Sequence, residues 1–309
     1  MLAKFFTALV SLLMIISPTL PHLLGLPAIP SGQDLNLEER FELTWADEFN
    51  GDELDRSVWQ TEWWVTERKG GFWHEDMVDV KDGNLIITTA YFDEPLENRY
   101  LDKWGDEIDF KEYKPGWYSA CITTNGTFEQ TYGYYECRCI LPKSAGMWSA
   151  FWMMNEGVYN VDGSGKDGTE VDIFESMYYK DVKWGFGDAV ISGIHYDGYG
   201  EGHNGDSIDK WYANNPYEEY NTYGLEWNEN EYIFYINGVE TGRLSTGGVS
   251  QNPEWLLLSC EVAGENGVAY ADRHGVGPMS MEPGETAEFI VDYVRVYQYK
   301  LAIIIQHLP

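Results

Sequence analysis

Three acidic residues are close together in one short segment, residues 168–178 (GTEVDIFESMY), that otherwise has the composition of a strand. The acids are Glu170, Asp172 and Glu175. Strands seldom hold such a group, because like charges on one face repel each other and acids pack poorly. Carboxyl groups held together have pKa values that move apart, so one can act as an acid near neutral pH while another stays ionised. The pattern indicates catalytic acids, with a solvated acidic strand or a set of calcium ligands as the alternatives.

The spacing of the acids also predicts an irregularity in the strand. Residues i and i+2 share a face, so Glu170 and Asp172 point the same way. In a regular strand, Glu175 would point to the opposite face. One bulged residue between Asp172 and Glu175 would return it to the same face, and bulges are common beside active sites.

The elements that must position this segment are also strands. Alternating, β-branched and aromatic residues predict strands over residues 84–91, 117–124, 133–142 and 147–154, among others. Asn237-Gly238 predicts a tight hairpin turn. No long segment has a helical period, and no repeat or low-complexity linker divides the chain. We therefore expect one all-β domain, a sandwich or a barrel, over residues 35–299.

The charge of the chain excludes one class of partner. The 309 residues carry 51 acids and 20 bases, a formal net charge of −31, and such a field repels the phosphate backbones of nucleic acids. Aromatic residues make up 16% of the chain, more than a core needs, and aromatic surfaces suit stacking against sugar rings or flat ligands. We expect no nucleic acid, no stable membrane partner, and a monomer.

The two ends of the chain differ in composition from the rest. Residues 1–30 contain Lys4 followed by the apolar run FFTALVSLLMII, which predicts a signal peptide and hence a secreted protein. A retained N-terminal membrane anchor is the alternative. Residues 300–309 form a short apolar tail, too short to span a bilayer and without a predicted role.

The four cysteines, Cys121, Cys137, Cys139 and Cys260, leave two interpretations open. An even number in a secreted chain permits disulfides. Cys137 and Cys139 share one face of a predicted strand and can equally be small buried apolar residues. No zinc-binding spacing of Cys and His is present.

Several segments, taken in order, resemble glycoside hydrolase family 16. They are WADEFNGDELDRSVW (residues 45–59), YGYYECRCILP (132–142), GMWSAFWMM (146–154), GTEVDIFE (168–175) in the bulged E-x-D-x-x-E form of the catalytic signature, GIHYDG (193–198) and VDYVRVYQ (291–298). The resemblance implies a jelly-roll sandwich of two bent antiparallel sheets with a concave glycan-binding cleft. It also implies a retaining double displacement on β-linked glucans or galactans.

The resemblance assigns roles to the three acids. It implies that Glu170 is the nucleophile and that Glu175 is the general acid and then the base. Asp172 lies between them and is expected to hold Glu170 and help set the protonation of the group.

Other residues are expected to bind substrate. Trp148 and Trp152 share a strand face and are predicted to stack on sugars, with core packing as the alternative. His195 is expected near the acids, with a structural role as the alternative. Arg138 is predicted to meet a substrate hydroxyl or carboxylate, unless it forms a structural ion pair. Trp73 is predicted to form an outer subsite from a loop.

A structural metal is the last expectation from the resemblance. Several relatives bind calcium on the convex side, and Glu48, the Gly83 carbonyl and Asp292 match that ligand pattern. The alternative is that Glu48 and Asp292 are surface charges. We expect no cofactor for catalysis.

The favoured substrate is a β-1,3-glucan or a mixed β-1,3-1,4-glucan. The first alternative is a β-galactan of the agar or carrageenan type, although sulfated chains would call for basic subsites and this chain has few Lys or Arg. The second alternative is a non-catalytic glycan-binding protein on the same fold, for which a spaced acid pair has no use.

Overall fold

The computed structural model describes residue 29 and residues 34–61, 67–97, 113–177, 179, 188–265, 268–269 and 279–300. The predicted signal segment, apart from Ile29, and the tail beyond Lys300 lie outside the described residues. Within the described part, no helix is both long enough and apolar enough to cross a membrane.

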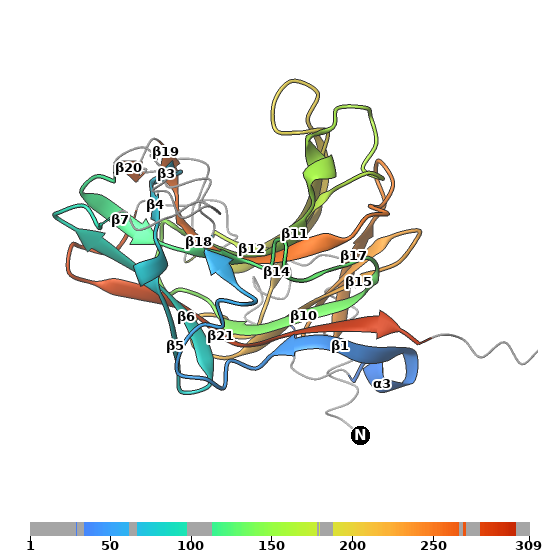
Figure 1. Ribbon diagram of the computed structural model, residues 1–309, viewed down its shortest axis with the longest axis horizontal. Coiled ribbons are helices and arrows are strands. Elements are labelled where there is room, and N and C mark those ends of the chain that lie inside the picture. Colours follow the sequence, from blue (N-terminus) through green and yellow to red (C-terminus); the bar gives the residue numbers. More distant parts are fainter. Residues whose placement is uncertain are drawn as a thin grey trace, which may run out of the picture.

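Two β-sheets are stacked on each other and form the body of the protein (Figure 1). The strands of the larger sheet are β1 (Phe41–Asp47), β3 (Glu67–Arg68), β4 (Gly71–Trp73), β5 (Val78–Lys81), β6 (Asn84–Phe92), β7 (Gly116–Ser119), β10 (Gly133–Ile140), β15 (Asn221–Trp227), β16 (Tyr232–Ile236), β17 (Val239–Leu244) and β21 (Thr286–Tyr299). Their order is β17-β16-β15-β10-β21-β6-β7-β4-β3, with β1 beside β21 and β5 beside β6. All of these pairs are antiparallel except β4 with β7.

The smaller sheet carries the acidic segment. Its strands are β2 (Gln60–Thr61), β8 (Cys121–Thr123), β9 (Glu129–Gln130), β11 (Met147–Met154), β12 (Glu170–Ser176), β13 (Ala189–Tyr196), β14 (Asn204–Tyr212) and β18 (Glu254–Val262). Their order is β14-β13-β12-β11-β18-β8-β2, with β9 beside β18, so the acid-bearing β12 is central. A two-stranded ribbon, β19 (Gly264–Glu265) and β20 (Val268–Ala269), follows β18.

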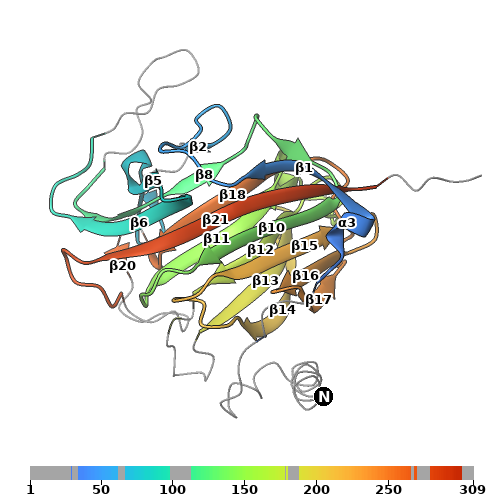
Figure 2. The same cartoon turned by 90° about the horizontal axis from the view of Figure 1, so that it is seen from below.

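Helical structure is short among the described residues. It consists of α3 (Leu37–Arg40) and the 3₁₀ turns η1 (Glu75–Met77) and η2 (Glu156–Tyr159). The prediction of an all-β jelly-roll sandwich is confirmed. Seen from below, β21 and β10 of the larger sheet lie in front of β11 and β12 of the smaller one, and the axes of the four strands are nearly aligned (Figure 2).

The main core fills the space between the two sheets. Cys137 and Cys139 of β10 point into it, together with Val171 and Phe174 of β12. All four cysteines are buried free thiols, so they pack as apolar residues and form no disulfide.

Two local predictions have different outcomes. The hairpin turn between β16 and β17 is confirmed: Asn237 and Gly238 both have positive φ, 50° and 74°, as this two-residue turn requires. The single strand predicted over residues 117–124 is wrong, because it divides at Ala120 into β7 of the larger sheet and β8 of the smaller sheet. Alternation of side chains does not reveal where one strand leaves a sheet and joins another.

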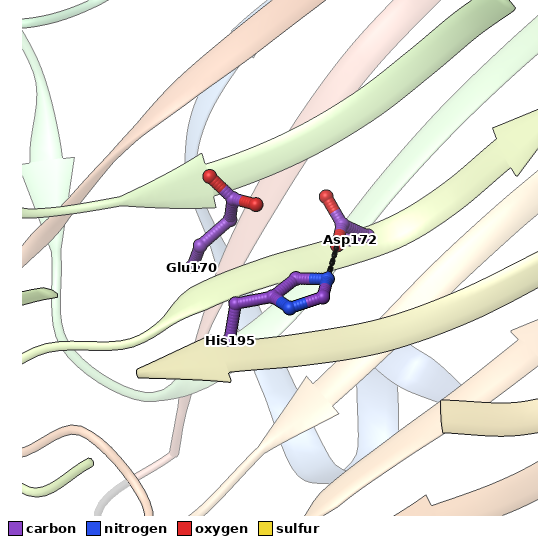
Figure 3. A group of neighbouring side chains, drawn as sticks. All are labelled: Glu170, Asp172 and His195. Atoms are coloured by element: carbon purple, nitrogen blue, oxygen red, sulfur yellow. Dashed lines mark ion pairs between the residues drawn. The ribbon is translucent and has the colours of Figure 1, made fainter. Parts of the chain in front are cut away.

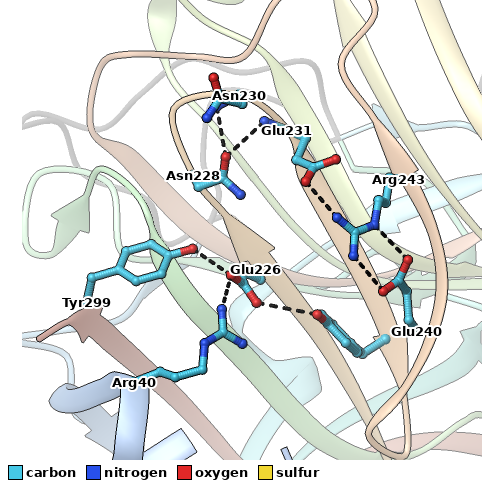
Figure 4. A network of polar contacts seen from close by, with 9 residues as sticks. Arg40, Glu226, Asn228, Asn230, Glu231, Glu240, Arg243 and Tyr299 are labelled. Carbon is cyan, nitrogen blue, oxygen red and sulfur yellow. Dashed lines mark hydrogen bonds and ion pairs between the residues drawn. The ribbon is translucent and has the colours of Figure 1, made fainter.

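The outer face of the larger sheet, which points away from the smaller sheet, holds paired charges. Glu226 accepts hydrogen bonds from Arg40 and from Tyr299 Oη, the latter at 2.8 Å (Figure 4). Arg243 bridges Glu231 and Glu240, with N···O distances of 2.7 Å to each. The Arg40 contact fastens α3 to the sheet, and the Arg243 contacts tie β17 to the residue that precedes β16.

Candidate active site

A β-bulge in β12 puts the three acids on one face of the smaller sheet. Asp172 pairs with Gly193 of β13 and Glu175 pairs with Ile191, so two residues of β12 oppose one of β13. The two residues between Asp172 and Glu175 are Ile173 and Phe174, and both point into the core between the sheets. The predicted bulge between Asp172 and Glu175 is therefore confirmed, and it restores Glu175 to the face of Glu170 and Asp172.

That face forms the floor of a cleft of about 740 Å³. The acids share the cleft with four of the predicted substrate-binding residues: Trp73, Trp148, Trp152 and His195. Other lining residues come from β3 and the turn after it (Arg68 and Lys69), from η2 (Tyr159), from the loop between β13 and β14 (Tyr199 and His203) and from β18 (Ser259 and Glu261).

Each of the three acids has its own hydrogen-bond or ionic partner. Trp148 Nε1 donates to Glu175 Oε1 at 2.7 Å. The Tyr199 hydroxyl donates to Glu170 Oε2. His195 Nε2 lies 3.4 Å from Asp172 Oδ2 (Figure 3). Neighbouring elements thus hold the three carboxyl groups in separate orientations.

Burial raises the pKa of all three carboxyl groups. The pKa of Glu175 rises to about 7, against the opposing effects of the Lys69 charge and the Trp148 hydrogen bond. Burial and the charges of Glu175 and Glu170 hold the pKa of Asp172 well above its usual range. Burial also raises the pKa of Glu170, although the Tyr199 hydrogen bond and the Arg68 charge act in the other direction.

These differences sort the acids chemically. A carboxyl group with a pKa of about 7 can give and take a proton at neutral pH, as a general acid and base must. Glu170, like Glu175, has a donated hydrogen bond and a nearby cation that favour its ionised form, here from Tyr199 and Arg68. Asp172 is buried between two other acids and retains a proton most readily.

His195 joins a second histidine at the edge of the cleft. Its Nδ1 lies 2.9 Å from Nε2 of His203, and the two rings are stacked. Burial and the neighbouring His203 lower the pKa of His195, so its neutral form is favoured near pH 7. Ligand atoms of Glu170, Asp172 and His195 lie within 4.8 Å of one another, a spacing that a divalent cation can bridge.

The predicted tryptophans differ in what they offer to a ligand. Trp148 is half-buried, lines the cleft and donates a hydrogen bond to Glu175. Trp152 is only 8% exposed and donates to Ser259 Oγ at 3.1 Å, so it both lines the cleft and packs. Trp73 was predicted on a loop, but it belongs to β4, is 4% exposed and donates to the Cys260 carbonyl. Its side chain is a wall of the cleft and not an outer platform.

Arg138 does not lie in the cleft, so its predicted role in substrate binding is wrong. Its neighbours Cys137 and Cys139 enter the core, so Arg138 points to the outer face of the larger sheet. There Arg138 Nη1 donates to Asp292 Oδ2 at 2.5 Å, and its guanidinium stacks on Tyr220. The alternative, a structural ion pair, is confirmed.

The same outer face contains two of the predicted calcium ligands. Glu48 accepts two hydrogen bonds from Arg295, at 2.7 and 2.9 Å. Asp292 is paired with Arg138. Gly83 lies in the turn between β5 and β6 with a φ of 75°. Because an arginine neutralises each carboxylate, this arrangement gives no support to the calcium site, which stays a prediction.

Sequence reasoning missed a group of charged residues in the cleft. Arg68 Nε lies 2.7 Å from Glu261 Oε1, and Lys69 Nζ lies 3.0 Å from Glu261 Oε2. Burial acts to raise the pKa of Glu261, but the charges of Arg68 and Lys69 outweigh it and the pKa is lowered. Period-2 alternation from Ser259 could have placed Glu261 on the cleft face, whereas no local signal brings Arg68 and Lys69 there.

Comparisons with known proteins agree with this geometry. The family model for the GH16 domain of beta-porphyranases A–D matches residues 42–299. The endo-1,3-1,4-beta-glycanase ExsH of Rhizobium meliloti (strain 1021) is 26% identical over 275 residues, which are 82% of this chain and 51% of that protein. The beta-glucanase of Rhodothermus marinus is 25% identical over 279 residues, 84% of this chain and 86% of that protein. The chain thus spans about half the length of ExsH.

Solved structures share the fold. The catalytic domain of an endo-1,3-beta-glucanase (laminarinase) from Thermotoga petrophila RKU-1 superposes with a TM-score of 0.60 at 23% identity, covering 84% of this chain and 99% of that one. A structure of endo-acting O-glycanases from the human gut microbiota gives 0.63 at 23% identity, covering 88% and 94%. With the family model matching most of the chain and the acids gathered in its cleft, the protein belongs to the GH16 glycoside hydrolases.

Proposed function

We propose that this protein is a retaining endo-glycosidase that hydrolyses β-1,3-glucan or mixed β-1,3-1,4-glucan. The observation that carries the proposal is the bulge in β12, which gathers Glu170, Asp172 and Glu175 on the floor of one cleft. Two relatives support the choice of a glucan: the beta-glucanase of Rhodothermus marinus by its substrate, and the endo-1,3-1,4-beta-glycanase ExsH by its linkages.

The proposed reaction has two displacements. Glu170 attacks the anomeric carbon, the glycosidic bond breaks, and Glu175 gives its proton to the leaving oxygen. A covalent glycosyl ester on Glu170 results. Water then attacks the same carbon, Glu175 takes its proton, and the ester bond to Glu170 breaks, so the product keeps the configuration of the substrate.

The remaining cleft residues support these steps. The Tyr199 hydrogen bond favours the ionised form of Glu170, which attack requires. The Trp148 hydrogen bond orients Glu175. Asp172, held near His195, keeps a proton between the two glutamates and so limits repulsion among them.

A β-galactan is the second candidate substrate. Two observations favour it: the matching family model is named for beta-porphyranases, and the cleft holds Arg68 and Lys69, the basic residues that the composition had made unexpected. Both bases are paired with Glu261, which reduces the charge they offer to a substrate. We therefore keep glucan as the first choice.

The experiment that tests the proposal is release of reducing sugars from laminarin, lichenan, agarose, carrageenan and porphyran. We expect internal cleavage of laminarin or lichenan, seen as a ladder of oligosaccharides. Cleavage of the galactans alone would replace the glucan assignment with the second candidate. Binding of a glycan without cleavage would favour a non-catalytic glycan-binding protein.

We also propose that the protein is secreted and acts as a monomer on extracellular polysaccharide. The support is the composition of residues 1–30, with Lys4 followed by an apolar run. Cell fractionation tests whether the protein is secreted, and light scattering tests whether it is a monomer. Recovery in a membrane pellet would favour the anchored alternative.

A further inference from the structure

Lys69 covers the side chain that is best placed to stack on a sugar near the acids. Its Nζ lies 2.9 Å from the centroid of the Trp148 ring, well within the range of a cation–π contact. The same indole donates to Glu175 at 2.7 Å, so its edge is engaged with the acid while Lys69 occupies its face. A sugar ring that stacks on this face has to replace the ammonium group.

The backbone of Lys69 is fixed in a conformation that holds the side chain in this position. Lys69 has a φ of 51°, in the left-handed region that non-glycine residues seldom adopt, and such strain tends to occur at functional sites. Lys69 forms a bridge with Val262, and Gly70 N donates to the Val262 carbonyl at 2.8 Å. A Cβ on Gly70 would meet the Ala263 carbonyl oxygen at 2.7 Å, so only glycine allows β18 to approach this closely.

The Lys69 side chain is partly exposed, and it has an anionic partner, Glu261, that it can keep when it moves. The Lys69 side chain is 25% exposed. Its ammonium is 3.0 Å from Oε2 of the buried Glu261. Lys69 can therefore leave the ring and still keep its ion pair, because a lysine stem is flexible and its ammonium is a point charge.

We propose that Lys69 is a gate: it covers the face of Trp148 in the free protein and is displaced when a sugar ring of the substrate occupies that face. The gate rests on the proposed function, because it concerns the same cleft and the same general acid. It makes Lys69 a positioning residue, whose charge is near Glu175 before the substrate binds and farther away afterwards.

Displacement of the gate changes the electrostatics of Glu175 in a defined direction. The titratable and charged groups around Glu175 are Arg68 from β3, Lys69 from the β3–β4 turn, Glu170 and Asp172 from β12, His195 from β13, and Glu261 from β18. Lys69 is the cation that lowers the pKa of Glu175. When a sugar moves Lys69 away, Glu175 holds its proton more tightly, which favours the acid form needed for the first step.

The experiment compares Lys69→Met with the wild type on the glycan that the wild type cleaves fastest. We expect KM to fall by roughly two- to thirtyfold, since substrate no longer has to break a cation–π contact. The basic limb of kcat/KM, which reports the free protein, moves to higher pH. The basic limb of kcat, which reports the complex, stays in place because Lys69 has already left Glu175.

Two further variants control this comparison. Lys69→Arg keeps the cation over the ring and should retain the wild-type profile. Lys143→Met makes the same charge change at a side chain that is 52% exposed and paired with Glu218, outside the cleft. Its kinetics should equal those of the wild type. If Lys69→Met folds poorly by thermal melting, Lys69→Gln takes its place.

A binding measurement separates failure of the gate from failure of the proposed function. Calorimetric titration of laminarin, lichenan, agarose and porphyran oligosaccharides into Glu170→Gln and into Glu170→Gln/Lys69→Met needs no turnover. Tighter binding by the double variant supports the gate even if the wild type cleaves no glycan. Unchanged or weaker binding, a raised KM, or coincident kcat/KM profiles would overturn the gate while leaving hydrolysis intact. A protein that neither binds nor cleaves any of them overturns both proposals.

Discussion

Carboxyl groups in the cleft of the smaller sheet and those on the outer face of the larger sheet have opposite surroundings. On the outer face, Glu48 faces Arg295, Asp292 faces Arg138 and Glu226 faces Arg40. In the cleft, among the described residues, no arginine or lysine forms an ion pair with Glu170, Asp172 or Glu175.

The difference separates acids that hold the fold together from acids arranged for chemistry. A paired carboxylate is stabilised as an anion and has little tendency to take a proton near neutral pH. Carboxyl groups that are buried together, with only neutral donors and one nearby pair of bases, retain protons that can be transferred. The cleft bases Arg68 and Lys69 are held by a fourth acid, Glu261, which leaves the three acids of β12 without ionic partners among the lysines and arginines that the structure describes.

The largest difference between the two faces should appear in catalysis. Glu170→Gln and Glu175→Gln each remove a reacting group, and we expect kcat to fall by about 10²- to 10⁴-fold with the fold unchanged. Glu240→Gln, on the outer β17 strand, makes the same substitution next to Arg243 and should leave kcat unchanged. Reducing-sugar assays and circular dichroism check this, and near-normal activity in either cleft variant contradicts the assignment.

The pH dependence of the rate should follow the cleft acids and not the outer ones. Glu175, with a pKa of about 7, must be protonated for the first step. We expect kcat/KM to fall about tenfold per pH unit above pH 7, and to fall also in acid as Glu170 becomes protonated. A profile that stays level up to pH 9 would exclude Glu175 as the general acid.

Stability should depend on pH with opposite signs on the two faces. The pKa of Glu175 is about 7 in the folded protein and close to about 4.3 when unfolded, so its stabilising contribution is present in acid and is lost as pH rises through 7. Glu175→Gln should therefore be more stable than the wild type at pH 8, by roughly 1–3 kcal/mol, and equal to it near pH 4.

Glu48 provides the matched comparison for that measurement. Its hydrogen bonds from Arg295 lower its pKa, so its contribution is present above the unfolded pKa and is lost as pH falls through the folded one. Glu48→Gln should melt below the wild type at pH 7, and the gap should close in acid. Melting curves of both variants and the wild type from pH 3 to pH 8 test this prediction. If the stability difference from the wild type changed with pH in the same direction for both variants, the distinction between the two faces would be contradicted.

Much of this arrangement was predictable from local patterns. The parity of Glu170, Asp172 and Glu175 predicts the bulge, and strand alternation with Asn237-Gly238 predicts an all-β domain. The prediction for Arg138 was wrong because the alternation of side chains shows which residues share a strand face but not which face lines the cleft. Lys69 and Glu261 are almost 200 positions apart in the sequence, and only the pairing of the β3–β4 turn with β18 brings them together.

The smallest expected effect concerns Arg138. Its side chain is 37% exposed, and its ion pair with Asp292 is of the kind that contributes about 0–1 kcal/mol. Arg138→Met should leave kcat/KM unchanged and lower the melting temperature slightly. A large loss of kcat/KM with unaltered stability would mean that the outer face takes part in substrate binding.

The stereochemistry of the first product tests the central claim most directly. Proton NMR of a glycan digest, recorded within the first minutes before the anomers equilibrate, shows the configuration of the newly formed reducing end. Double displacement through Glu170 and Glu175 predicts that the β-anomer appears first and the α-anomer follows by mutarotation. Initial appearance of the α-anomer would contradict the account, because it requires direct attack by water on the anomeric carbon.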